Sequence, residues 1–183
     1  MKASNFFNYF RLFICMIMVL SSYSTSAKKP DGSCTPTEVK THIIINTGAA
    51  TIWNILLDVK SYPNWNPYIY EIRGTIKKGS FVNFRMKKGE GERKFKAEIL
   101  DLKINETWAW GGGLLFFFKA RHYFILHPID NTHTEIIQGE YWHGLFGKSF
   151  GKKVYQESCI NFGKMNEKLK QLAEEGSVNG FSK

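Results

Sequence analysis

Alternating apolar and polar residues mark a series of β-strands along the chain. Residues 38–46, EVKTHIIIN, alternate and then become β-branched, a pattern typical of a strand. Six further strand-like runs follow, at about 69–76, 80–88, 93–103, 106–112, 119–127 and 132–143. Glycine- or asparagine-containing segments separate them, and we interpret Gly89–Gly91 and Gly111–Gly113 as turns. Because the connections are short, the pattern predicts successive antiparallel hairpins.

Two short helices are expected after the first strand. Thr47 would cap a helix that runs to about Val59. Pro63 and Pro67 then exclude a long continuing helix, because proline lacks a backbone donor and biases the preceding residue toward extended conformations. Between them, the Trp65 ring is too apolar to remain in water without a reason. We interpret this bend either as the rim of a cavity or as a structural corner packed on the sheet edge.

The period changes to that of a helix from residue 150 to about residue 174. One stripe falls at steps of four and three, typical of an amphipathic helix about 37 Å long: Phe150, Val154, Ser158, Phe162, Met165, Leu169 and Leu172. Only this helix is long enough to cover the apolar face of the sheet. The sequence therefore predicts an α+β helix-grip fold, in which a curled seven-stranded antiparallel sheet grips the C-terminal helix. A single helix cannot fill a curled sheet, so we expect a cavity between them.

The N-terminal residues 1–27 have the pattern of a signal peptide. Lys2 and Arg11 provide positive charge, Leu12–Leu20 is a nine-residue apolar core, and small residues precede a cleavage site at Ala27. The alternative is an uncleaved N-terminal anchor, although a spanning helix needs about 20 apolar residues. We expect an N-terminal segment at 28–36, one domain at 37–174 and a flexible tail at 175–183. The mature protein would be exported, to the periplasm or outside the cell.

Charge and cysteine content narrow the possible partners. The chain carries a net charge of +9, and its basic residues are scattered in pairs without a nucleic-acid motif, so no nucleic-acid partner is expected. Cys34 and Cys159 would remain after cleavage, and in an oxidising compartment they could form a disulfide between the N-terminal segment and the last helix. The alternative is two free thiols. His42, His127 and His133 lie on different strands and faces, so we expect no metal and no cofactor.

Several segments of the chain resemble the START-like (SRPBCC) superfamily, and within it the polyketide cyclase/dehydrase-like branch. The resemblance covers about residues 37–174. It rests on Trp53 with Leu56–Asp58, Tyr62–Ile69, Gly79, Trp108–Trp110, His122–Pro128, Thr134–Gln138, Glu140, Trp142, Gly144–Phe146, Met165–Asn166 and Leu169–Lys170. It implies a deep hydrophobic cavity that binds lipids, sterols, polyketides or aromatic metabolites, and in some members cyclase or dehydratase activity. The fold hosts unrelated functions, so it does not by itself define the activity.

Strand alternation assigns side chains to the inner face of the sheet. His122 would share that face with Phe124, and a tight hairpin around Asp130 would place His122 opposite Gln138 and diagonal to Glu140. The expected cavity residues are aromatic and apolar, with one small polar cluster. They are Trp65, Phe84, Met86, Phe95, Trp108, Trp110, His122, Phe124, Gln138, Glu140, Trp142, Phe162 and Met165.

Two functions fit this cavity. The first is a monomeric, non-catalytic binder or carrier of a small hydrophobic ligand. The second is a cyclase- or dehydratase-type enzyme in which His122 and Glu140 transfer protons. A third and weaker hypothesis is a protein-interaction module whose pocket only reflects packing. The apolar run Leu114–Phe118 cannot face inward throughout, and it is either the start of a strand or a portal loop that contacts a membrane.

Overall fold

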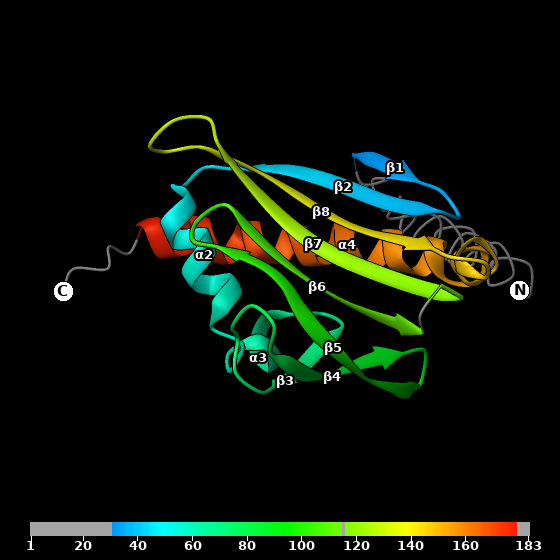
Figure 1. Ribbon diagram of the computed structural model, residues 1–183. Coiled ribbons are helices and arrows are strands. Elements are labelled where there is room, and N and C mark those ends of the chain that lie inside the picture. The colour runs from blue at the N-terminus through cyan, green and yellow to red at the C-terminus, as the bar shows by residue number, and fades with distance from the viewer. Residues whose placement is uncertain (1–30, 115, 179–183) are drawn as a thin grey trace, which may run out of the picture.

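The computed structural model describes residues 31–114 and 116–178. An eight-stranded antiparallel sheet curls around a long C-terminal helix (Figure 1). The strands are β1 (Gly32–Cys34), β2 (Glu38–Ile45), β3 (Ile69–Arg73), β4 (Phe81–Lys88), β5 (Gly91–Lys103), β6 (Thr107–Leu114), β7 (Phe118–Pro128) and β8 (Thr134–His143). The helices are α2 (Ala49–Leu57), α3 (Tyr62–Trp65) and α4 (Gly147–Val178). The predicted α+β helix-grip architecture is confirmed.

The strand order is β1-β2-β8-β7-β6-β5-β4-β3, so β3 to β8 form consecutive hairpins and β2 closes against β8. The predicted count of seven strands is one too low, because residues 32–34 also join the sheet by pairing with β2. A three-residue strand is too short to show an alternating pattern. The predicted signal peptide at 1–27 lies outside the described residues. No helix within the described residues is long and apolar enough to span a membrane.

The ends of two helices differ from the prediction. The cap of α2 is Gly48, not Thr47, and no side chain caps this helix. Thr47 is instead buried, and its backbone carbonyl accepts a hydrogen bond from the Thr134 hydroxyl at 2.9 Å. Helix α4 continues to Val178 rather than ending at 174, because a glycine such as Gly176 lowers helix propensity by about 1 kcal/mol but does not interrupt the backbone hydrogen bonds.

The glycine triplet Gly111–Gly113 is not a turn. It lies inside β6 and pairs with Lys119, Ala120 and Arg121 of β7. A Cβ on Gly111 would lie 2.4 Å from the Ala120 carbonyl oxygen, so the close approach of the two strands requires glycine there. The actual turn comes after Leu114, where the Phe117 amide bonds the Leu114 carbonyl at 3.0 Å.

Helix α4 is fixed to one side of the sheet. A disulfide between Cys34 and Cys159 joins it to β1, with the two Cα atoms 6.0 Å apart. Further along α4, Asn166 donates a hydrogen bond to the Thr41 hydroxyl of β2 at 3.0 Å. Near its end, Lys170 donates to the Ile44 carbonyl at 2.6 Å. These attachments place the length of α4 along β1 and β2.

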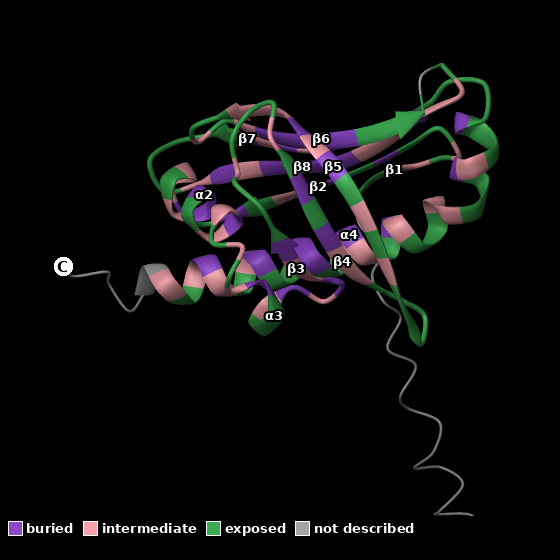
Figure 2. Ribbon diagram, turned by 60° about the horizontal axis from the view of Figure 1, so that its bottom comes forward, coloured by how far each residue is buried: buried purple, intermediate pink, exposed green. Residues whose placement is uncertain are grey.

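The apolar stripe of α4 covers the sheet, as the sequence predicts. Phe162, Met165, Leu169 and Ala173 are buried, while Phe150 and Val154 nearer the start of the helix are only half-buried (Figure 2). The main backbone contacts of α4 are with β2 and β8. The half-buried first part of the helix therefore faces a region of the curled sheet that it does not fill.

Candidate functional site

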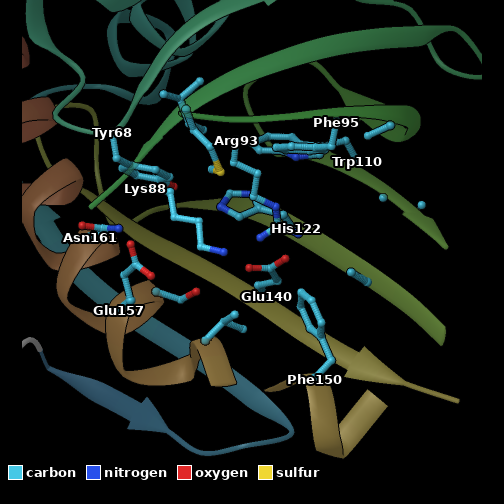
Figure 3. Close-up of a pocket in the computed structure, with 18 of the residues that line it drawn as sticks. Tyr68, Lys88, Arg93, Phe95, Trp110, His122, Glu140, Phe150, Glu157 and Asn161 are labelled. Atoms are coloured by element: carbon cyan, nitrogen blue, oxygen red, sulfur yellow. The ribbon is translucent and has the colours of Figure 1, made fainter. Parts of the chain in front are cut away.

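A cavity of about 220 Å³ lies between the first half of α4 and the inner face of β4 to β8 (Figure 3). Its wall includes aromatic residues of the sheet and the helix, among them Phe95, Trp110, Phe118 and Phe162. Phe150, Val154 and Ser158 form the side contributed by the start of α4. The space exists where the helix leaves the sheet incompletely covered.

The aromatic wall is a continuous set of stacked rings. The Trp110 ring lies 4.1 Å from the His122 ring and 5.1 Å from the Phe84 ring, and Phe84 stacks on Phe95 at 4.9 Å. These residues meet because period-2 alternation places each on the inner face, and the hairpin register aligns Phe84 with Phe95 and Trp110 with His122. The result is a stack of aromatic rings beside the cavity, an apolar surface suited to an aromatic or other apolar ligand.

Small residues on the same strands leave room beside this wall. Gly112 and Ala120 line the cavity, and they are aligned across β6 and β7. Gly112 follows Trp108 and Trp110 on the inner face, where a larger side chain would occupy the cavity. Their small size is therefore a direct cause of the open space.

His122 lies on the inner face, as predicted, but its register is different. It is aligned with Glu140, and Phe124 is aligned with Gln138, so the predicted His122–Gln138 pairing is wrong by two residues. The β7–β8 connection spans residues 129–133, longer than the tight hairpin expected from Asp130. His122 and Gln138 still touch, with 3.1 Å between the Gln138 amide nitrogen and the His122 Nε2.

The His122 imidazole behaves as a buried aromatic ring. Burial lowers the pKa of His122 to about 3, so the ring is neutral at physiological pH. An amide nitrogen can only donate, so Nε2 accepts the Gln138 hydrogen bond and the ring proton resides on Nδ1. The Phe162 ring packs edge-on against the imidazole at 5.0 Å. His122 therefore does not share a proton with Glu140 near neutral pH.

The pKa of Glu140 is shifted toward neutrality. Glu140 lines the cavity and is half-buried. Burial raises the pKa of Glu140 to about 7, even though the nearby Arg93 guanidinium attracts its charged form. The carboxyl group can therefore both release and accept a proton near neutral pH, which is a requirement for an acid–base catalyst and also for a charge-sensitive binding group.

A buried polar cluster connects the proline bend to the sheet and to α4. The Gln138 amide donates to the Tyr68 hydroxyl at 3.2 Å, and Tyr68 lines the cavity. The side-chain oxygen Oδ1 of Asn66 accepts hydrogen bonds from the Tyr68 and Ile69 backbone amides at 3.1 and 2.9 Å. Asn66 also donates to the Met165 sulfur at 3.4 Å. The bend therefore places Tyr68, not Trp65, at the cavity.

Trp65 was expected at the cavity rim, but it does not line the cavity. The single turn of α3 directs Tyr62 inward, where the fully buried Tyr62 hydroxyl donates to the Leu56 carbonyl at 2.8 Å. Trp65 packs on the outer edge of that ring at 5.0 Å and is half-buried. This arrangement corresponds to the alternative interpretation, a structural corner.

The other predicted cavity residues fall into two groups. Six line the cavity, namely Met86, Phe95, Trp110, His122, Glu140 and Phe162. Six others are buried but do not line it, namely Phe84, Trp108, Phe124, Gln138, Trp142 and Met165. Alternation predicts which face of the sheet a side chain occupies, but it does not predict which part of each strand the helix leaves uncovered.

The sequence interpretation missed the charged residues of the cavity. Lys88 and Arg93 lie on the inner-face positions that continue Met86 and Phe95 toward the β4–β5 turn. Figure 3 shows Lys88 extending over the cavity toward Glu140. The same period-2 rule that identified Met86 and Phe95 would have found both residues if it had been extended by one step on each strand. From α4, Glu157 and Asn161 also line the cavity.

An exposed apolar patch adjoins the cavity. Leu114 and Phe116 are 64% and 69% exposed, and Leu145 and Phe146 are also exposed. Two backbone hydrogen bonds join the β6–β7 turn to the loop before α4, from Leu145 to Phe116 and from Phe146 to Phe117. We call Leu114, Phe116, Phe117, Leu145 and Phe146 the apolar patch. Phe118 turns inward from it and lines the cavity, while Leu115 lies outside the described residues.

The part of the chain that the structure describes contains no group of three or more histidine, cysteine, aspartate or glutamate side chains placed to hold a metal ion. The cavity offers aromatic side chains, one carboxyl group that titrates near neutrality, and basic side chains. Such a set can bind an apolar molecule and orient a polar group on it.

Solved structures with the same fold include proteins from several bacteria. The Zhui aromatase/cyclase from Streptomyces sp. R1128 has a TM-score of 0.61 at 12% identity, covering 78% of this chain and 98% of its own. A protein from Chromobacterium violaceum has a TM-score of 0.60 at 12% identity, covering 76% and 99%. The di-domain ARO/CYC BexL has a TM-score of 0.59 at 9% identity, covering 78% and 48%. At these identities the similarity establishes the fold alone.

Sequence comparison identifies the family. A search of curated proteins finds no match. The profile of the family described as "Polyketide cyclase / dehydrase and lipid transport" matches residues 36–174, almost the same range as the resemblance in the sequence. The chain therefore belongs to the polyketide cyclase/dehydrase and lipid transport family.

Proposed function

We propose that this protein is an exported binder or carrier of a small hydrophobic ligand. The observation that carries the proposal is the cavity between α4 and the sheet, lined by Phe95 and by the stacked rings of Trp110 and His122. Membership of a family that includes lipid transport supports it. The ligand would be a lipid, sterol, polyketide or aromatic metabolite whose flat apolar part lies on this wall.

Export is part of the proposal. The signal-peptide pattern at 1–27 supports it, and so does the Cys34–Cys159 disulfide, because disulfides persist in oxidising compartments. The disulfide also attaches α4 to β1 at the level of the cavity-lining residue Ser158. The oxidised form would therefore be the one that holds the cavity open.

The apolar patch would contact a membrane while the ligand enters or leaves. Exposed lysines flank it, at Lys119 on β7 and Lys148, Lys152 and Lys153 on the first turns of α4. Apolar side chains inserted between lipids and lysines at the headgroup level are the usual elements of anionic-membrane binding. Because Phe118 continues from the patch into the cavity, an apolar path would connect the membrane to the binding site.

Glu140 supports a second candidate function, that of a cyclase- or dehydratase-type enzyme. The observation that favours it is a carboxyl group inside the cavity with a pKa of about 7. Since the neutral His122 does not titrate in this range, Glu140 would act as the proton donor and acceptor by itself, and His122 would orient the ligand. Binding alone requires no such proton transfer, so we rank the binder first.

Filling the cavity should abolish ligand binding without unfolding the protein. Ala120→Phe places a phenyl ring in the space opposite Phe150, so binding of the fluorescent apolar probe Nile red should weaken by about tenfold or more. Fluorescence titration measures the binding, and the thermal midpoint confirms the fold. Ala120→Ser is the matched control and should bind like the wild type. If Ala120→Phe folds and binds Nile red like the wild type, the cavity is not the binding site.

The apolar patch should determine membrane binding. Phe116→Ser combined with Phe146→Ser should reduce sedimentation with phosphatidylglycerol-containing vesicles by about fivefold or more, because each change removes an exposed ring from the lipid contact. Ile104→Ser is the control, since Ile104 is also exposed but lies on the β5–β6 turn. If the double variant and the wild type sediment equally with the vesicles, the apolar patch does not determine membrane binding.

The Glu140 carboxyl should make folding stability depend on pH. The pKa of Glu140 is higher in the folded protein than in the unfolded chain. Its contribution to the free energy of unfolding is therefore complete below about pH 4 and is lost as pH rises through about 7. Between about pH 5 and pH 8 the wild type should lose about 2 kcal/mol more unfolding free energy than Glu140→Gln. Urea unfolding measures this, with exposed Glu106→Gln as control. If Glu140→Gln and the wild type show the same pH dependence of unfolding free energy, a group other than Glu140 causes it.

A further inference from the structure

Arg93 is placed differently from the paired arginines on the outer face of the same sheet. On that face Arg85 pairs with Glu71 and Glu92, at 3.5 and 2.7 Å, and Arg73 pairs with Glu71 at 2.7 Å. Arg93 is on the inner face of β5 and lines the cavity. Within the described residues it has no carboxylate at ion-pair distance and no hydrogen-bond acceptor for its side chain. Its five N–H donors are therefore available to another group.

The position of the Arg93 guanidinium is nevertheless fixed. Its central carbon lies 5.6 Å from the centre of the Phe95 ring and 5.5 Å from the centre of the Phe150 ring. One ring belongs to the sheet and the other to α4, so the guanidinium bridges the two sides of the cavity. Cation–π contacts hold a guanidinium in place without using its N–H groups. Arg93 is thus half-buried and oriented. The Glu140 carboxyl attracts it electrostatically, but no described residue accepts a hydrogen bond from its guanidinium.

The charge around the cavity determines which anion could bind there. The basic lining residues are Lys87, Lys88, Arg93 and Lys96, and the acidic ones are Glu140 and Glu157. The basic lining residues outnumber the acidic ones by two, so the lining attracts an anion, and a singly charged anion would meet less repulsion from the two carboxyl groups than a doubly charged phosphate. A planar carboxylate matches the two parallel N–H groups of a guanidinium. These features favour a monocarboxylate.

We propose that the cavity selects a small aromatic monocarboxylate, whose ring lies against Trp110 and Phe95 and whose carboxylate pairs with Arg93. This inference rests on the proposed binding function and specifies its ligand class. Lys88, which extends over the cavity in Figure 3, adds a second positive charge near the carboxylate. A bound carboxylate would satisfy the unpaired guanidinium and leave the apolar part of the ligand on the aromatic wall.

Two probes of the same shape test this selection. Isothermal titration compares 2-naphthoate with neutral 2-naphthylmethanol at neutral pH. The wild type should bind the carboxylate about tenfold more tightly, and Arg93→Gln should remove that preference while leaving the affinity for the alcohol within about twofold. Arg93→Lys should retain part of the preference. Because binding of the alcohol reports an intact cavity, a misfolded variant would be recognised.

Lys94→Gln is the matched control. Lys94 is adjacent to Arg93, but it does not line the cavity, and its ammonium group lies 2.7 Å from the Glu92 carboxylate. The change should leave both affinities as in the wild type. Equal affinity of the wild type for the two probes would overturn the inference and leave the binding function intact. So would an equal loss of affinity for both probes in Arg93→Gln. Failure of both probes to bind the wild type would overturn both.

Discussion

The attachment of α4 to one side of the sheet is the constraint on which the rest of the structure depends. The Cys34–Cys159 disulfide, the Asn166–Thr41 hydrogen bond and the Lys170–Ile44 hydrogen bond hold the helix along β1 and β2. The curl of the sheet then carries β4 and β5 over the other flank of the helix, where they meet only its half-buried first part. If α4 were free to move toward those strands, the cavity could close by packing, as protein interiors usually do.

The strands on the open side are built to keep that space. Gly112 and Ala120 provide little bulk. Trp110 stacks on His122 and on Phe84, which stacks on Phe95, so these rings cannot move into the space without breaking ring contacts. The Asn66 side chain fixes the proline bend by bonding two backbone amides and the Met165 sulfur. The two prolines thus turn the chain so that Tyr68 and Ile69 complete the wall.

The sequence predicted the inner face of the sheet well, because period-2 alternation depends only on local geometry. His122, Phe124, Gln138 and Trp142 are all on the expected face. The cross-strand partner of His122 was wrong because it depends on loop length, and nothing local indicates that the β7–β8 connection has five residues. The glycine triplet looked like a turn because close strand pairing and a turn both require glycine. Trp65 was misplaced because its neighbour Tyr62 takes the buried position.

The charged groups of the cavity bear on both candidate functions, ligand binding and catalysis. His122 is neutral, Glu140 titrates near neutrality, and Arg93 has no carboxylate at ion-pair distance within the described residues. This arrangement can recognise a polar group on an apolar ligand, and it contains one proton-transfer group rather than a matched acid and base. A binder that orients its ligand through charge requires only this set. In a catalytic role, Glu140 would have to serve as both proton donor and proton acceptor, with His122 orienting the ligand.

Native mass spectrometry of the exported, oxidised protein tests the central claim most directly. The account predicts one small apolar molecule bound per chain, released by organic extraction and absent from the correctly folded Ala120→Phe variant. A protein that carries no adduct as purified, and that acquires none after incubation with total lipid extract or with 2-naphthoate, would contradict it.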